Sequence, residues 1–469
     1  MKFKYQLIIL FLSFNIIVAA EIPTKSVVKI FSSISISDYK NPWQTSKISR
    51  YTGSGAIIEN NLILTSAHVV SDAVFIEVKK ENDPKKYIAK VKYISHQADL
   101  ALLEVNDEKF YKNTEPLKLN NTVKHREEVT VLGYPIGGNT ISTTTGVISR
   151  IEYSKYTWSK EFLLAIQIDA AINSGNSGGP AIDKEGQLIG IAMQKLNGSS
   201  NISYIVPSII IETFLNDIKD DKVDGFYYSS TTVNSIENDY MKDYYGLKNG
   251  NGVLVTYVDV NNNVLKVDDI IMEIDGVPVA NNMTIKSEFG RVNFNLLFHS
   301  KQIGSIVNLK ILRDRKLITV PYELKRSSKL IKEEFNTKPR YIIFGGLSFT
   351  PLTKNYLRTL KMKENEINML FYKQEKDKER DEIVVWMQTI FPHNINRGYY
   401  SGAETITKVN GIKVKNFNHF IQLIDNSETE YTVIDCLEKK KIILKTEEAK
   451  NSFKSISSKY YLSNDRRAY

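Results

Sequence analysis

The chain has 469 residues, which is too long for a single hydrophobic core, so about three domains of ordinary size are expected. Apolar residues make up 42% and charged residues 25% of the chain, a composition that excludes wholesale disorder. The formal net charge is +9, but no Arg-rich groove or known nucleic-acid motif concentrates it. We therefore predict a mixed basic surface and no nucleic-acid partner.

The first 20 residues predict a secretory signal peptide. Lys2 and Lys4 precede an apolar run from Leu7 to Val18, and the small residues Ala19 and Ala20 follow. The alternative is an uncleaved membrane anchor, but the run is shorter than the ~20 residues that a spanning helix needs. We expect an exported protein, periplasmic in a Gram-negative bacterium and otherwise in the secretory pathway or outside the cell.

From Ser26 to Pro207 the chain alternates short β-type runs with turn residues, and no long helical period appears. This pattern predicts all-β barrels. The expected strands are Ser26–Phe31, Gly55–Glu59, Leu62–Ser66, Val74–Lys79, Lys90–Ile94, Val129–Gly133, Leu163–Asp169 and Leu188–Met193. Apolar residues at helical spacing in Ser208–Ile218 then predict a helix that closes the domain.

Within this region His68, Asp99 and Ser177 have the order and setting of a catalytic triad. His68 follows an apolar strand, and Ser177 lies in the glycine-rich turn Ile-Asn-Ser-Gly-Asn-Ser-Gly-Gly-Pro. Asp99 heads the buried run Asp-Leu-Ala-Leu-Leu, where an unpaired carboxylate would be costly and a histidine partner removes the cost. A serine becomes a strong nucleophile when a histidine takes its proton and a carboxylate orients that histidine.

Other residues near the triad have alternative interpretations. His96, three residues before Asp99, competes with His68 as the base, but we expect it in a surface loop. Glycines around Ser177 permit positive φ, so the amides of Gly175, Asn176 and Ser177 are expected to converge on a developing oxyanion.

Neither a metal nor any other cofactor is predicted, because the six histidines are scattered without metal-ligand spacing. The single cysteine, Cys436, lies in an apolar run that predicts a buried, inert thiol.

These motifs, together with Gly53–Ile58, Gly133–Gly137 and Thr145–Ser149, resemble the trypsin-like domain of the HtrA/DegP serine proteases over most of residues 25–218. The resemblance implies a mainly β protein whose residues 21–222 form a chymotrypsin-like double β-barrel with the site in the cleft. It also implies an ATP-independent serine endopeptidase that degrades unfolded or damaged exported proteins. The alternative is a catalytically weak peptide-binding or chaperone assembly that retains the protease fold.

In related proteases the strand at residues 201–206 borders the pocket for the residue before the scissile bond. Here it offers Tyr204, Ile205 and Val206 and no acidic side chain. The resemblance therefore implies a pocket for a small aliphatic side chain, with modest discrimination.

After a polar linker at residues 219–225, an internal repeat appears. Ile271–Val279 resembles Ile406–Val414, and each contains Asp-Gly or Asn-Gly, the preferred dipeptides of a tight hairpin turn. With Gly252–Val255 and Phe344–Leu352, this part resembles the two-PDZ branch known from plant Deg proteases.

The resemblance implies PDZ-like α+β domains at residues 223–327 and 338–449, joined by the charged segment Lys325–Arg340 and followed by a loose tail at 450–469. Tyr228-Ser229-Ser230 replaces the Gly-rich dipeptide expected in the first carboxylate-binding loop, which leaves capture of C-terminal carboxylates open. The second domain is implied to join copies of the chain into a homo-oligomer.

Overall fold

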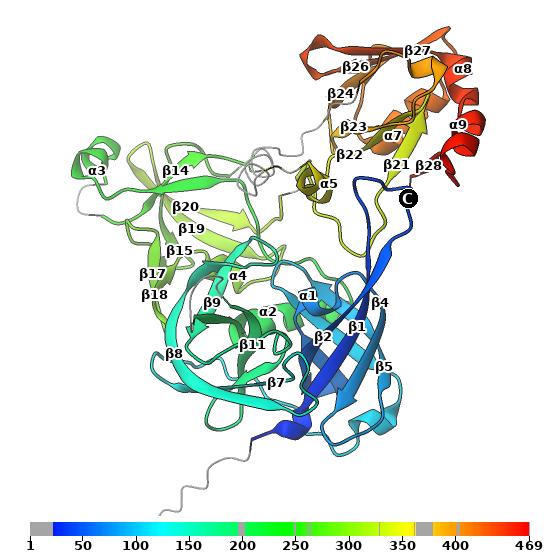
Figure 1. Cartoon of the computed structure of the whole chain (residues 1–469). Coiled ribbons are helices and arrows are strands. Elements are labelled where there is room, and N and C mark those ends of the chain that lie inside the picture. The colour runs from blue at the N-terminus through cyan, green and yellow to red at the C-terminus, as the bar shows by residue number, and fades with distance from the viewer. Residues whose placement is uncertain are drawn as a thin grey trace, which may run out of the picture.

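The computed structural model describes residues 22–195, 202–247, 250–259, 262, 264–327, 329–360, 362, 379–400 and 404–468. The predicted leader lies outside these residues. The described part is mainly β: two closed barrels are followed by two further sheets, each with short helices (Figure 1). This architecture confirms the predicted double barrel with two PDZ-like α+β domains. No helix in the described part is long and apolar enough to cross a membrane.

The first barrel closes in the order β1-β2-β3-β6-β5-β4. Its strands are β1 (Val27–Ile36), β2 (Lys47–Ile58), β3 (Leu62–Thr65), β4 (Ala73–Lys80), β5 (Tyr87–Ser95) and β6 (Leu100–Val105). One short helix, α1 (Ala67–Val70), interrupts the barrel between β3 and β4. Val69 and Val70 of α1 are buried in the barrel core, which fixes the helix at the barrel rim.

The second barrel closes in the order β10-β11-β12-β9-β8-β7. Its strands are β7 (Glu128–Gly133), β8 (Ser142–Lys155), β9 (Phe162–Ile168), β10 (Pro180–Ile182), β11 (Leu188–Lys195) and β12 (Ser203–Pro207). Each strand predicted from the sequence overlaps a strand of one of the two barrels. The predicted closing helix is α2 (Ser208–Asp217).

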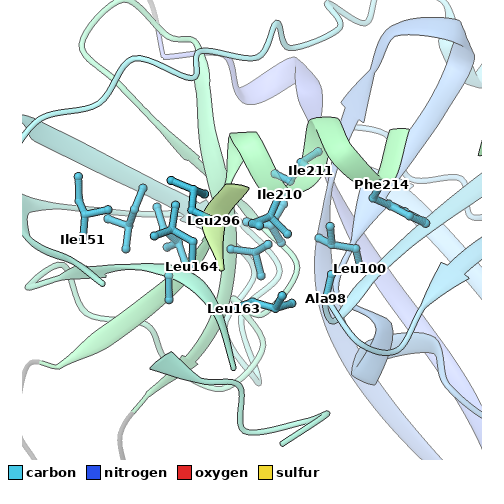
Figure 2. Close-up of a cluster of buried hydrophobic side chains, with 14 of the residues drawn as sticks. Ala98, Leu100, Ile151, Leu163, Leu164, Ile210, Ile211, Phe214 and Leu296 are labelled. Atoms are coloured by element: carbon cyan, nitrogen blue, oxygen red, sulfur yellow. The ribbon is translucent and has the colours of Figure 1, made fainter. Parts of the chain in front are cut away.

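One hydrophobic cluster spans the two barrels, in addition to the separate core inside the first barrel. Figure 2 shows Leu100 of the first barrel, Leu164 of the second and Phe214 of α2 in the same cluster, with Leu296 from the following domain beside them. Burial of this continuous apolar surface holds the two barrels and the next domain in contact.

The third sheet has the order β13-β14-β15-β19-β20. Its strands are β13 (Thr232–Ser235), β14 (Val253–Tyr257), β15 (Ile270–Ile274), β19 (Ile306–Arg313) and β20 (Lys316–Glu323), with β16 (Val277–Pro278) paired to β15. The hairpin β17 (Thr284–Ser287) and β18 (Gly290–Asn293) and the helices α3 (Asp239–Tyr245) and α4 (Leu296–His299) complete this domain.

The fourth sheet has the order β27-β26-β24-β23-β22-β21-β28. Its strands are β21 (Tyr341–Phe344), β22 (Leu347–Pro351), β23 (Val384–Ile390), β24 (Glu404–Val409), β26 (Tyr431–Cys436), β27 (Lys441–Lys445) and β28 (Arg466–Arg467), with β25 (Ile412–Lys413) paired to β24. Its helices are α5 (Lys354–Thr359), α7 (Phe417–Asp425), α8 (Thr446–Asn451) and α9 (Phe453–Tyr460).

The short 3-10 helices are η1 (Thr24–Ser26), η2 (Glu59–Asn61), η3 (Glu108–Tyr111), η4 (Ile218–Asp220), η5 (Asn394–Asn396) and η6 (Leu437–Lys439). Cys436, at the end of β26, is buried as predicted, and burial raises the pKa of its thiol to about 11.

The internal repeat forms the same hairpin twice, as predicted. Asp275-Gly276 turns with φ of 48° and 80°, and Asn410-Gly411 turns with φ of 48° and 81°. Positive φ at both turn residues is the geometry that such dipeptides favour. The copies then diverge, because α7 has 9 residues whereas the first copy continues into an inserted hairpin and the 4-residue α4.

Residues 450–468 do not form the loose tail that we expected. Helix α9 buries Ile456 in a cluster with Tyr341, Ile343 and Phe391, and β28 pairs with β21. The expectation overlooked the helical spacing of Phe453, Ile456 and Tyr460, which places three apolar side chains on one helix face.

The charged segment at 325–340 also differs from a free linker. Leu330 and Ile331 are buried against Tyr356 and Leu357 of α5. The segment after Leu330 is therefore packed on the fourth sheet and belongs physically to that domain.

Candidate active site

His68 lies on α1, at the edge of the first barrel. The helix begins immediately after the buried strand β3, and its neighbours Val69 and Val70 point into the core. The imidazole is left partly exposed, with 27% of its side chain at the surface.

Asp99 lies directly before β6 and is completely buried. Its Oδ2 atom is 2.7 Å from Nδ1 of His68, and its Oδ1 atom accepts a hydrogen bond of 2.9 Å from the backbone N–H of His68. A carboxylate beside Nδ1 fixes the tautomer with the proton on Nδ1, so Nε2 is free to accept a proton. The structure thus brings together the predicted base and acid.

Ser177 lies in a turn whose shape depends on glycine. Gly175 has φ of +100° and Gly178 has φ of +83°. A Cβ atom on Gly178 would come within 2.2 Å of Thr65 Oγ1, and one on Gly175 within 2.5 Å of the Tyr134 carbonyl oxygen. The turn therefore packs closely against the first barrel and the β7 end of the second.

Ser54 of β2 holds this turn in place, a role that we did not predict. Its N–H donates to the Ser177 carbonyl at 2.9 Å, and its hydroxyl donates to the Gly175 carbonyl at 2.8 Å. The same hydroxyl accepts from the Tyr134 N–H at 2.8 Å. The Gly-Ser-Gly motif before His68 was the available signal, but its partners are more than 75 residues away along the chain.

Gly53 shows that the nucleophile turn and α1 face each other. A Cβ atom at this position would lie 2.5 Å from Val69 Cγ1 and 3.3 Å from the Ser177 carbonyl oxygen. The residue next to His68 and the backbone of Ser177 therefore flank the same glycine. No hydrogen bond joins Ser177 Oγ to His68 in the described structure, and such bonds in ligand-free sites often tighten only when substrate binds.

The amide groups near Ser177 differ in availability. The Asn176 N–H donates to the Asn173 carbonyl at 2.9 Å, so it is already engaged in this conformation. The N–H groups of Gly175 and Ser177 have no acceptor among the described residues. Of the three amides predicted to bind an oxyanion, those of Gly175 and Ser177 are therefore the ones without an acceptor among the described residues.

His96 lies in the turn after β5, as expected, but its ring is not free at the surface. Its ring stacks on Phe335 with a centroid distance of 3.8 Å, and Trp158 Nε1–H donates to its Nδ1 atom at 3.4 Å. Phe335 comes from a segment more than 200 residues away, so the local sequence around His96 gave no sign of this contact.

The predicted specificity residues are more buried than a pocket wall requires. Ile205 and Val206 have no exposed surface, and Tyr204 is 6% exposed with its hydroxyl 3.2 Å from Glu152 Oε1. Strand β12 pairs with β11 and β9 on its two edges, and Ile205 and Val206 join the shared core of the protein. In this structure the side chains of Ile205 and Val206 are therefore enclosed in the core, and their role in specificity stays a prediction.

A cavity lies between the first PDZ-like domain and the second barrel. Its volume is about 430 Å³, and it is lined by Tyr227, Val233 and Phe298 of that domain and by Leu163 of β9. Tyr228 and Ser229, from the loop where a carboxylate-binding site is expected, line the same cavity.

Comparison with known proteins identifies the family. Residues 53–191 match the model of the trypsin-like peptidase domain, and residues 331–468 match that of a PDZ domain. The chain is 38% identical to putative protease Do-like 3, mitochondrial, of Arabidopsis thaliana, over 91% of this chain and 76% of the relative. It is 34% identical to protease Do-like 4, mitochondrial, of the same plant, over 91% and 82%.

Among solved structures, the HtrA-type protease AlgW with tripeptide superposes with a TM-score of 0.51 at 22% identity, over 65% of this chain and 94% of that one. This likeness shows a shared fold. Together with the sequence identities and the matched domains, it establishes that the chain belongs to the Do-like (HtrA/DegP) family of serine proteases.

Proposed function

We propose that this protein cleaves unfolded or damaged proteins without ATP, by acyl-enzyme catalysis at Ser177. The observation that carries the proposal is the distance of 2.7 Å between the buried Asp99 carboxylate and Nδ1 of His68. His68 lies on α1, and this helix faces the turn that carries Ser177. An aspartate bound to one ring nitrogen leaves the other nitrogen free to activate a serine.

In the proposed reaction, Ser177 Oγ attacks the peptide carbonyl carbon while His68 Nε2 takes its proton. The amides of Gly175 and Ser177 donate hydrogen bonds to the oxyanion of the tetrahedral intermediate. His68 then gives the proton to the leaving amine as the C–N bond breaks, and an ester on Ser177 remains. A water molecule, activated by His68, hydrolyses this ester, and Asp99 stabilises the imidazolium in both steps.

Labelling with an active-serine phosphonate tests this proposal. The wild-type chain should be labelled stoichiometrically, and Ser177→Ala should not be labelled at all. The alternative function, a peptide-binding or chaperone assembly that retains only the fold, predicts no labelling of the wild type.

The pH dependence of kcat/KM should follow His68. Burial lowers the pKa of the imidazole, but the Asp99 charge and hydrogen bond raise it more, so its pKa lies above the ordinary value of about 6.5. Protonated His68 cannot accept the serine proton, so activity should fall as the pH falls through this raised pKa. Initial rates on a peptide substrate should show one acidic limb with its midpoint above about 6.5; a flat profile between about pH 5 and 8 would contradict the mechanism.

Peptides with Val, Ile or Ala before the scissile bond should be cleaved about 10- to 200-fold faster than matched peptides with Arg, Lys or Asp. Residues 171–176, which directly precede Ser177 along the chain, contain no acidic side chain to pair a cation. An unpaired charge buried there would carry a desolvation cost. A peptide library decides this point, and a preference for Arg or Lys would overturn it.

The location and assembly of the protein are further parts of the proposal. The two plant relatives are named as mitochondrial, so we propose that this chain acts in a membrane-bounded organelle, and a periplasmic location has no support from them. Imaging of a C-terminal fluorescent fusion would show a diffuse cytosolic signal if this is wrong. Association into a homo-oligomer through the second PDZ-like domain stays a prediction, and a monomeric native mass of the full chain would contradict it.

A further inference from the structure

The rings of His96 and Trp158 form an aromatic platform at the edge of the catalytic site. Trp158 lies in the turn between β8 and β9, and its ring centroid is 6.2 Å from that of His68. His96 lies just after β5, in the first barrel, and is joined to Trp158 by the 3.4 Å hydrogen bond between ring nitrogens. The aromatic platform is therefore built from both barrels and adjoins the catalytic histidine.

Phe335 covers this aromatic platform. Its ring is parallel to that of His96 within 9° at 3.8 Å and lies 5.5 Å from Trp158. The next residue, Asn336, exchanges two hydrogen bonds of 2.5 Å with Asp72: each backbone N–H donates to the side-chain oxygen of the other residue. Asp72 comes two residues after α1, so the same short segment contacts the chain just beyond the helix that carries His68.

The segment that carries Phe335 is held by the second PDZ-like domain. Asn355 of α5 accepts from the Glu334 N–H and donates to the Glu334 carbonyl, both at 2.9 Å. Arg358 of the same helix pairs with Glu333 at 2.5 Å. The contact between Phe335 and the aromatic platform is therefore a contact between the last domain and the protease domain.

The contact is open to displacement. Phe335 is only half-buried, and Asn336, Thr337 and Lys338 after it are exposed. A cavity of about 420 Å³, lined by His96, Ser159 and Phe335, lies beside the stacked rings. An incoming side chain thus has both a path to the aromatic platform and space into which Phe335 can move.

We propose that the aromatic platform is a substrate subsite for an aromatic or large apolar side chain a few residues before the scissile bond, and that Phe335 fills it in the resting chain. The inference rests on the proposed protease function, and it adds that Phe335 competes with the substrate side chain for the same subsite. An aromatic face next to the catalytic histidine favours a flat apolar side chain. Such side chains are mostly buried in folded proteins and become accessible in unfolded ones, so the subsite would select the proposed substrates.

A substrate can use the subsite only in those molecules from which Phe335 has moved away. Its apparent affinity is therefore the affinity for the open subsite multiplied by the fraction of molecules in which the subsite is open. One aromatic stacking contact changes an equilibrium constant by a factor of about 2 to 10. Phe335→Ala should therefore raise kcat/KM by about 2- to 10-fold for a peptide with Phe in the subsite. The rate for a peptide with Ser at that position should change less than about twofold, because Ser gains nothing from the aromatic platform.

The experiment uses the full chain and quenched fluorescent peptides that differ only by Phe or Ser at the second, third or fourth residue before the scissile bond. Rates are normalised by phosphonate titration of active sites, which needs no subsite and so reports separately on the proposed function. Phe75→Ala, at an exposed phenylalanine of β4, is the matched control and should behave as the wild type. Asn336→Ala, which removes the side-chain tether to Asp72, should act in the same direction as Phe335→Ala and serves if the latter does not fold.

The preference for Phe should disappear when Trp158→Ala is added to Phe335→Ala. Equal acceleration of the Phe and Ser peptides, or no acceleration, would overturn the proposal, as would a Phe preference that survives Trp158→Ala. If the phosphonate labels no active sites, the proposed function fails. The subsite is then tested by binding alone: fluorescence anisotropy measures the affinity of the peptides for Ser177→Ala, with and without Phe335→Ala. A 2- to 10-fold tighter binding of the Phe peptide alone then supports the subsite, and unchanged affinity overturns it.

Discussion

Ser177→Ala should lower the rate of casein cleavage by about four to six orders of magnitude, and His68→Ala should have a similar effect. The serine supplies the attacking oxygen and the histidine removes its proton, so neither can act without the other. Because the two residues work as a unit, the double variant should be scarcely slower than either single variant. The measurement is casein or peptide turnover at equal concentrations of folded protein, with folding checked by circular dichroism.

Ser174→Ala is the matched control for this experiment. Ser174 is exposed in the same turn, and its backbone carbonyl accepts a hydrogen bond from the Ile136 N–H. Because this bond uses the backbone, an alanine at the position can still form it. This variant should retain most of the wild-type rate. Retention of more than about a tenth of the rate by Ser177→Ala would refute the assignment of the nucleophile.

Asp99→Asn should lower kcat/KM by about four orders of magnitude while the fold is preserved. In the wild type the carboxylate accepts hydrogen bonds from both the ring and the backbone of His68. An asparagine amide group can donate a hydrogen bond to Nδ1, which favours the tautomer with its proton on Nε2, and that nitrogen can no longer accept the proton of Ser177.

The comparison variant for Asp99→Asn is Asp107→Asn. Asp107 is a partly exposed carboxylate that pairs with Lys85 on the surface of the same barrel. Exposed ion pairs contribute little to stability, so this variant should keep both its activity and its melting temperature. If Asp99→Asn stays within about tenfold of the wild type, Asp99 does not have the role proposed here.

The residues of the triad were predicted from the sequence because their signals are local. His68 and Asp99 each adjoin an apolar strand. The turn around Ser177 has positive φ at positions 175 and 178, and the glycines at both positions indicate such a turn in the sequence. The strands of both barrels were predictable for the same reason, since alternation of apolar runs and turn residues depends on neighbours along the chain. The paired hairpins of the repeat likewise follow from two dipeptides.

Only the tertiary structure decided which groups near the triad are available. In the folded chain the amide of Asn176 donates a hydrogen bond to the Asn173 carbonyl, and Ser54 supports the nucleophile turn through its hydrogen bond to the Gly175 carbonyl. The tertiary structure also removed Ile205 and Val206 from the surface, because strands on both sides and the shared core enclose them. The last two of these outcomes depend on contacts between segments that are distant along the chain, whereas the Asn176–Asn173 hydrogen bond is a local turn whose geometry the residue types alone do not specify.

The stacking of Phe335 on His96 is the clearest example. Two residues separated by more than 200 positions meet because the last domain packs its first segment on α5 and presents it to the protease barrels. The residue types of the candidate site could be predicted from the sequence, since they stand in short motifs. The surroundings of the site were decided by the packing of whole domains, since burial and stacking depend on the surface that each domain presents to the others.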